Sequence, residues 1–156
     1  MNVLYNSINR INSYLLEIPE KINKIPEGEF TYKKSPEKWS KKEIFGHLCD
    51  SAVNNLSRFV LAQFEGEPFS IVPYAQDDWV RVNCYNDMDT GELLNYWITL
   101  NRQIVRVISN IPEAKLAVKI ELGNAAFRED STDKTLLWLI EDYVIHMEYH
   151  LKQIVE

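Results

Sequence analysis

The stretch SKKEIFGHLCDSAVNNLSRFVLAQFE, residues 40–65, indicates the fold of this 156-residue chain more clearly than any other part of it. It opens with Ser40-Lys41-Lys42-Glu43, a capping box in which the two outer side chains accept hydrogen bonds from backbone N–H groups of the first turn. Apolar residues then recur at helical spacing until Gly66 and Pro68, which are residues that end helices. The stretch therefore predicts one long amphipathic helix over residues 40–65.

Three other segments have the same apolar periodicity. Residues 3–25 predict a first helix, which Pro19 should bend or divide because proline lacks a backbone donor and clashes with the preceding turn. Residues 90–111 predict another helix, which Pro112 ends, and the last helix should begin near Ser131, with Asp133 in its first turn. Four long amphipathic helices in residues 1–156 predict a single all-α domain, a four-helix bundle of the up-and-down type.

The connections between these helices differ in character. Residues 26–38 contain Pro26 and Gly28 and predict a loop. Residues 66–89 are rich in aromatic side chains and show no sustained period, so we expect a long loop that covers a site. Residues 116–122 alternate apolar and polar side chains before Gly123-Asn124, which predicts a strand, a turn and therefore a short β-hairpin before the last helix.

The composition excludes several classes of function. Hydrophobic residues make up 46% and charged residues 26% of the chain, as in ordinary globular proteins. The net charge of −6 and the lack of a lysine or arginine run argue against nucleic acid as a partner. The first seventeen residues contain no apolar stretch of signal-peptide or membrane-span length, so we expect a cytosolic protein without membrane contact. Cys49 and Cys84 lack a paired spacing and are predicted to be packing residues.

All three histidines of the chain lie in predicted helices. His146 and His150 are four residues apart, so they project from one helical face, and His47 belongs to the helix of residues 40–65. Three imidazoles suit a metal site with open coordination positions. The alternative is that these are ordinary surface histidines or core histidines with satisfied hydrogen bonds.

A polar stripe accompanies His47 along its helix. Asp50, Ser51, Asn54 and Arg58 lie three, four, seven and eleven residues after it, on the same side of an otherwise apolar helix. Because burying unpaired polar groups is costly, such a stripe indicates either partners across the bundle or a solvated face.

A family resemblance rests on two motifs and a third segment. The first motif is Lys38-Trp39-Ser40-x-x-Glu43-Ile44-x-Gly46-His47-Leu48-x-Asp50-Ser51-x-x-Asn54-Asn55-x-x-Arg58-Phe59, and the second is His146-x-x-x-His150-Leu151-x-Gln153-Ile154. The third segment is Pro73-Tyr74-x-x-Asp77-x-Trp79, in the long connection. Together they resemble the DinB-like superfamily, and within it the bacillithiol-transferase-like branch of metal-dependent hydrolases.

The resemblance implies a four-helix bundle that often forms a homodimer and holds a divalent metal ion. The implied ligands are one histidine of the second long helix and the H-x-x-x-H pair of the last, which match His47, His146 and His150. The branch often has further histidines at two positions where this chain has Gly46 and Ala52. The implied metal ligands are all present in this chain, but the substrate of the related branch cannot be assigned to it.

Six residues are candidates for a substrate pocket. Asp142 lies one turn before His146 and is a candidate to orient an imidazole, or an ordinary exposed acid. Asp50, Asn54 and Arg58 are candidates to bind polar groups of a substrate, with the forked donor of Arg58 suited to a carboxylate, or else to tie helices together. Tyr74 and Trp79 are candidates to wall the pocket, or to pack on the bundle.

The leading functional hypothesis is a divalent-metal-dependent enzyme that activates a thiol or water, as a thiol S-transferase or hydrolase acting on a small molecule. A low-molecular-weight thiol is one candidate substrate, and Zn, Ni, Fe and Mn are all candidate metals. The competing hypothesis is a non-catalytic stress-response module that binds a metal or a small ligand. A third is a helical structural protein without metal.

Overall fold

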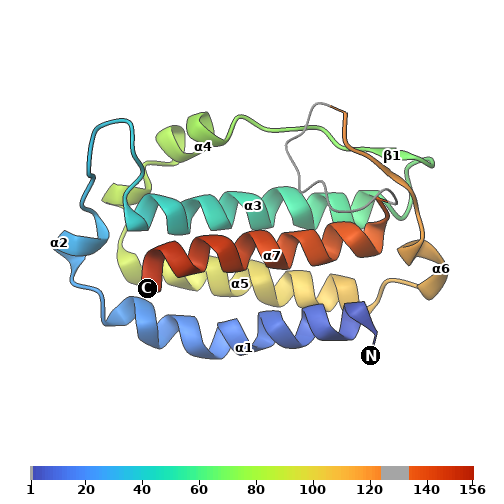
Figure 1. Ribbon diagram of the computed structural model, residues 1–156, viewed down its shortest axis with the longest axis horizontal. Coiled ribbons are helices and arrows are strands. Elements are labelled where there is room, and N and C mark those ends of the chain that lie inside the picture. The colour runs from blue at the N-terminus through green and yellow to red at the C-terminus, as the bar shows by residue number, and fades with distance from the viewer. Residues whose placement is uncertain (1, 124–133) are drawn as a thin grey trace.

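The computed structural model describes residues 2–123 and 134–156, and four long helices lie side by side in it (Figure 1). The predicted all-α four-helix bundle is confirmed. Its helices are α1 (Val3–Asn23), α3 (Lys41–Leu61), α5 (Thr90–Ser109) and α7 (Leu136–Val155).

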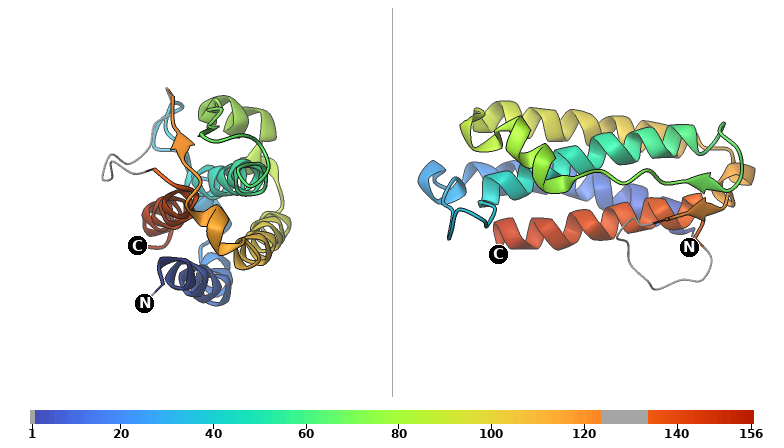
Figure 2. Two further views of the ribbon diagram at one scale, coloured as in Figure 1. Left: turned by 90° about the vertical axis from the view of Figure 1, so that its right-hand side faces the viewer. Right: turned by 90° about the horizontal axis from the view of Figure 1, so that it is seen from above.

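The four helices do not simply alternate in direction. α1 and α7 run one way along the bundle, while α3 and α5 both run the other way (Figure 1). Each of α1 and α3 contacts both α5 and α7, so α1 and α3 lie at opposite corners, as the end view in Figure 2 shows. Because α3 and α5 are parallel, residues 62–89 must return along the bundle, and they do so beside α3 (Figure 2).

The predicted helix start at Ser40 is confirmed, and the predicted end is wrong by four residues. The Ser40 Oγ accepts from the Glu43 N–H at 3.0 Å, and the Glu43 carboxylate accepts from the Ser40 N–H at 2.8 Å. α3 ends at Leu61, and residues 62–65 continue only as hydrogen-bonded turns. α1 is one helix despite Pro19, so the alternative of a divided helix is wrong.

The long connections contain short elements that the sequence analysis missed. The predicted loop of residues 26–38 includes helix α2 (Glu27–Phe30). The connection between α3 and α5 includes strand β1 (Phe69–Ser70), helix α4 (Gln76–Asn83) and a 3-10 helix, η1 (Tyr85–Asp87). The expectation that residues 66–89 lack regular structure is therefore wrong, because elements this short do not produce a readable period.

The strand predicted in residues 116–122 is shorter and pairs differently from a hairpin. Helix α6 (Glu113–Leu116) includes its first residue, and strand β2 (Ile120–Glu121) pairs in parallel with β1, with Phe69 opposite Ile120. The turn predicted at Gly123-Asn124 falls partly outside the described residues, as do Ser131 and Asp133. α7 begins later than predicted, at Leu136, after Thr135 caps it by accepting from the Trp138 N–H.

Apolar side chains from all four long helices fill the centre of the bundle. Trp97, Phe45 and Phe59 are fully buried there. Cys49 is buried as predicted, but Cys84 is exposed, so its predicted packing role is wrong. Within residues 2–123 and 134–156, no helix combines the length and apolar character needed to cross a membrane.

Candidate metal centre

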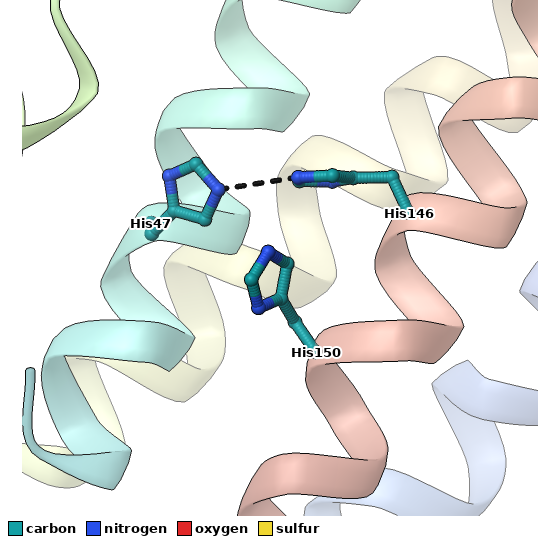
Figure 3. Close-up of side chains that lie close together, drawn as sticks. All are labelled: His47, His146 and His150. Atoms are coloured by element: carbon teal, nitrogen blue, oxygen red, sulfur yellow. Dashed lines mark hydrogen bonds between the residues drawn. The ribbon is translucent and has the colours of Figure 1, made fainter. Parts of the chain in front are cut away.

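The three histidines converge between α3 and α7 (Figure 3). His47 lies in the second turn of α3, and His146 and His150 project from one face of α7. The Nε2 atoms of His47 and His146 are 3.2 Å apart. One ring nitrogen from each of the three residues lies within 4.8 Å of those of the other two. The structure therefore brings together the three histidines that were predicted to share a metal ion, although His47 and His146 are 99 residues apart in the sequence.

All three imidazoles are neutral at neutral pH. Burial, reinforced by the neighbouring His146 and His150, lowers the pKa of His47 to about 3. Burial and then His150 lower the pKa of His146 to about 4, and burial lowers the pKa of His150 as well. A neutral imidazole has the nitrogen lone pair that a metal ligand needs.

The spacing of these nitrogens fits a metal ion. A zinc ion with bonds of about 2.0–2.1 Å in tetrahedral geometry places its ligand nitrogens about 3.3 Å apart. The separation of 3.2 Å between the Nε2 atoms of His47 and His146 matches this value, and a ring nitrogen of His150 lies within 4.8 Å of both residues' ligand atoms. Three protein ligands leave at least one coordination position for another molecule.

Polar partners hold the outward nitrogens of the two α7 rings. The Nδ1 of His150 lies 2.8 Å from the Gln153 Oε1, and the Nδ1 of His146 lies 3.4 Å from the Ser51 Oγ. Such contacts fix the orientation of a ring and leave its Nε2 free for an ion. Neither contact was predicted, although Gln153 follows His150 by three residues and so shares its helical face.

Asp142, the predicted orienting acid, is buried one turn before His146. Its role in holding an imidazole stays a prediction, because the ring contacts described above come from Ser51 and Gln153. The buried Nδ1 of His47 has no hydrogen-bond partner in the described part of the chain. The ring of half-buried Trp39 lies 4.9 Å from that of His47 and shields it from one side.

Asp50, one turn after His47, is the acceptor in a small buried network. The Tyr85 hydroxyl donates to its Oδ1 at 2.5 Å, and the Asn83 amide donates to the same atom at 3.3 Å. Its Oδ2 is buried and has no hydrogen-bond partner among the described residues. Burial raises the pKa of Asp50 to about 6, against the opposing effect of the bond from Tyr85.

Gly46 makes the approach of Tyr85 possible. A Cβ atom at position 46 would lie 2.1 Å from the Tyr85 Cδ2, which is far inside contact distance. A glycine at position 46 is therefore needed for the ring that binds Asp50 to pack there. The sequence contained the signal, a glycine inside a long helix, but could not identify the ring packed on it.

Of the remaining candidates, Asn54 and Arg58 lie further along α3, Tyr74 lies in the connection before α4, and Trp79 lies in α4. Asn54, Arg58 and Tyr74 line a cavity of about 300 Å³ beside the C-terminal half of α3. Trp79 is half-buried and packs edge-on against Tyr74, with ring centroids 5.4 Å apart. The aromatic connection thus lies over the face of α3 that carries the polar stripe, as Figure 2 shows for its path.

Comparison with known proteins agrees with this architecture. The sequence model of the DinB superfamily matches residues 15–154. The chain belongs to the DinB superfamily. Its fold is similar to that of YfiT from Bacillus subtilis, with a TM-score of 0.79, 18% sequence identity, and coverage of 97% of this chain and 83% of that one. YfiT is described as "a probable metal-dependent hydrolase with an unusual four-helix bundle topology". No curated protein matches the sequence significantly.

Proposed function

We propose that this DinB-superfamily protein is a divalent-metal-dependent enzyme that activates a thiol or water for attack on a small molecule, as a thiol S-transferase or a hydrolase. The observation that carries the proposal is the convergence of three neutral imidazoles from two helices, with one ring nitrogen of each within 4.8 Å of the others and at least one coordination position left open. A cytosolic location and a homodimer belong to the same proposal and rest on the sequence and the family.

The residues around the site have different roles. His47, His146 and His150 hold the ion, while Ser51 and Gln153 keep the α7 rings turned toward it. When bound, a divalent ion supplies Lewis acidity, which lowers the pKa of a coordinated water or thiol toward neutrality. The half-buried ring of Trp39, whose centroid lies 4.9 Å from that of His47, limits the access of bulk water, which strengthens electrostatic interactions inside the site.

The competing function is binding without turnover. A structural zinc site usually fills all four positions with protein ligands, whereas the described residues supply a group of three. The open position favours catalysis over a structural role. The description of YfiT as a probable metal-dependent hydrolase supports the same choice.

The test is a thiol-conjugation and hydrolysis assay on protein loaded separately with Zn, Ni, Fe or Mn. We expect turnover with at least one metal, and its loss together with bound metal in His146→Ala. Tyr149→Phe, an exposed neighbour on α7, is the matched control and should keep both. Metal-loaded protein that is inert toward a panel of thiols, electrophiles and amides would instead favour the binding module.

A further inference from the structure

The cavity beside α3 is distinct from the histidine cluster and has its own polar lining. It measures about 300 Å³, which suits a small organic molecule. The polar side chains that line it, within the described part of the chain, are Asn54, Ser57, Arg58, Glu65, Ser70 and Tyr74.

Arg58 is the dominant charge in this lining. Its side chain belongs to a residue only 8% exposed, and burial lowers its pKa, although a guanidinium stays protonated at all ordinary pH values. One terminal nitrogen donates to the Val72 carbonyl at 3.1 Å, the other to the Asn55 Oδ1 at 3.4 Å, and the group lies 5.9 Å from the centre of the Tyr74 ring. These contacts hold the planar guanidinium in a fixed orientation at the cavity wall, so little conformational freedom remains to be lost when an anion binds there.

A chain of polar contacts connects Arg58 to the histidine site. The Asn55 amide, which accepts from Arg58, donates to the Ser51 carbonyl at 2.9 Å and to the Ser51 Oγ at 3.3 Å. The Ser51 Oγ in turn contacts His146. Tyr74 lines the cavity, and burial raises its pKa to about 12 while Ser51 acts in the opposite direction, so the same serine borders both regions. Arg58 follows Ser51 by seven residues, or about 10 Å along the helix axis.

We infer that the cavity is an anion-binding subsite in which Arg58 anchors a carboxylate of a small organic molecule. The inference rests on the proposed function, because a molecule held by its carboxylate at Arg58 would lie on the same helix face as His47, toward which the contacts of Asn55 and Ser51 lead. A carboxylate matches the planar fork. Glu65 adds a negative charge to the lining, which disfavours a doubly charged phosphate.

The probe for the test is butyrate, with butyramide as its neutral isostere, titrated into metal-free protein and followed by NMR at constant ionic strength. We expect butyrate, and not butyramide, to shift the amide signals of the C-terminal half of α3. Arg58→Gln should weaken butyrate binding at least tenfold. Arg102→Gln, which removes an exposed arginine from α5, is the charge-matched control and should bind as the unmodified chain does.

Ser57 provides a second test that leaves the buried arginine in place. It lines the cavity at an exposed helix position, so substitution there should not disturb the core. Ser57→Lys should strengthen and Ser57→Glu should weaken butyrate binding by roughly fivefold each, while neutral Ser57→Gln should change it little. If Arg58→Gln does not fold, the opposite effects of Ser57→Lys and Ser57→Glu on butyrate affinity still test whether the cavity binds an anion.

Equal binding of butyrate and butyramide, no binding of either, or affinities unaffected by the charge at position 57 would overturn the inference. Because the protein is free of metal throughout, these results do not depend on the proposed reaction. If the protein binds butyrate but shows no turnover, the anion-binding subsite is supported and the proposed reaction is wrong. If it shows turnover but does not bind butyrate, the proposed reaction is supported and the subsite is wrong.

Discussion

Lowering the pH should destabilise the metal-free protein because its histidines titrate differently in the folded and unfolded chains. In the folded chain the pKa of His47 is about 3 and that of His146 about 4, against 6.5 for the unperturbed side chain. The unfolded chain therefore binds protons that the folded chain excludes. The stabilisation is fully present above about pH 6.5 and is lost as the pH falls toward the folded values.

The size of the effect follows from these values. Between about pH 7.5 and about pH 5, each of His47 and His146 should cost about 2 kcal/mol of unfolding free energy. Asp50, whose pKa is raised to about 6 from 3.8, acts in the opposite direction, because the folded chain takes up this proton more readily than the unfolded chain. It adds about 1 kcal/mol to the free energy of unfolding over the same interval. The net loss from these three groups is about 3 kcal/mol, to which His150 adds in the same direction as the other histidines.

Urea unfolding with a chelator at both pH values measures this loss, and His146→Gln isolates one contribution. The acid-induced loss should be about 2 kcal/mol smaller in His146→Gln than in the unmodified chain. Tyr149→Phe, on the exposed side of the same helix, should show the full loss. An equal loss in His146→Gln and the unmodified chain would mean that the His146 ring titrates alike in both states, and would refute its burial in the cluster.

Substitutions at three positions test other contacts by urea unfolding. Gly46→Ala forces the Tyr85 ring to move and should lower the free energy of unfolding by about 1–3 kcal/mol, despite the better helix propensity of alanine. A variant as stable as the unmodified chain, or more stable, would contradict this packing. Ser40→Ala removes the capping hydroxyl and should cost about 1 kcal/mol, while Ser40→Thr should recover most of it; equal losses would exclude the cap as the cause. Tyr143→Phe removes the buried bond to the Asn101 Oδ1 at 2.6 Å and should cost about 1–3 kcal/mol, and a neutral result would show that Asn101 finds another donor.

The long helices could be predicted because each repeats an apolar period over several turns and carries its own start signal, such as the capping box at Ser40. α4 could not, because its eight residues make about two turns and bury only Val80. The pairing of β2 with β1 depends on a contact between Phe69 and Ile120, and local sequence carries no information about so distant a partner.

In the candidate site, too, contacts within one helix could be predicted from the sequence, and contacts between distant segments could not. The four-residue spacing of His146 and His150 placed both on one face, but the meeting with His47 across the bundle came from family resemblance rather than from spacing. The contact of Gln153 with His150 follows from helical geometry and could have been predicted. The Tyr85 bond to Asp50 could not, because it depends on how the long connection folds back on α3.

Elemental analysis of the purified protein, combined with anomalous diffraction from its crystals, tests the central claim most directly. We expect one divalent ion per chain, bound between α3 and α7 by His47, His146 and His150. His146→Ala should lose the ion while its circular dichroism remains that of a helical bundle. An ion retained equally in His146→Ala, or no ion bound after addition of Zn, Ni, Fe and Mn, would contradict the assignment of these three histidines as a metal centre.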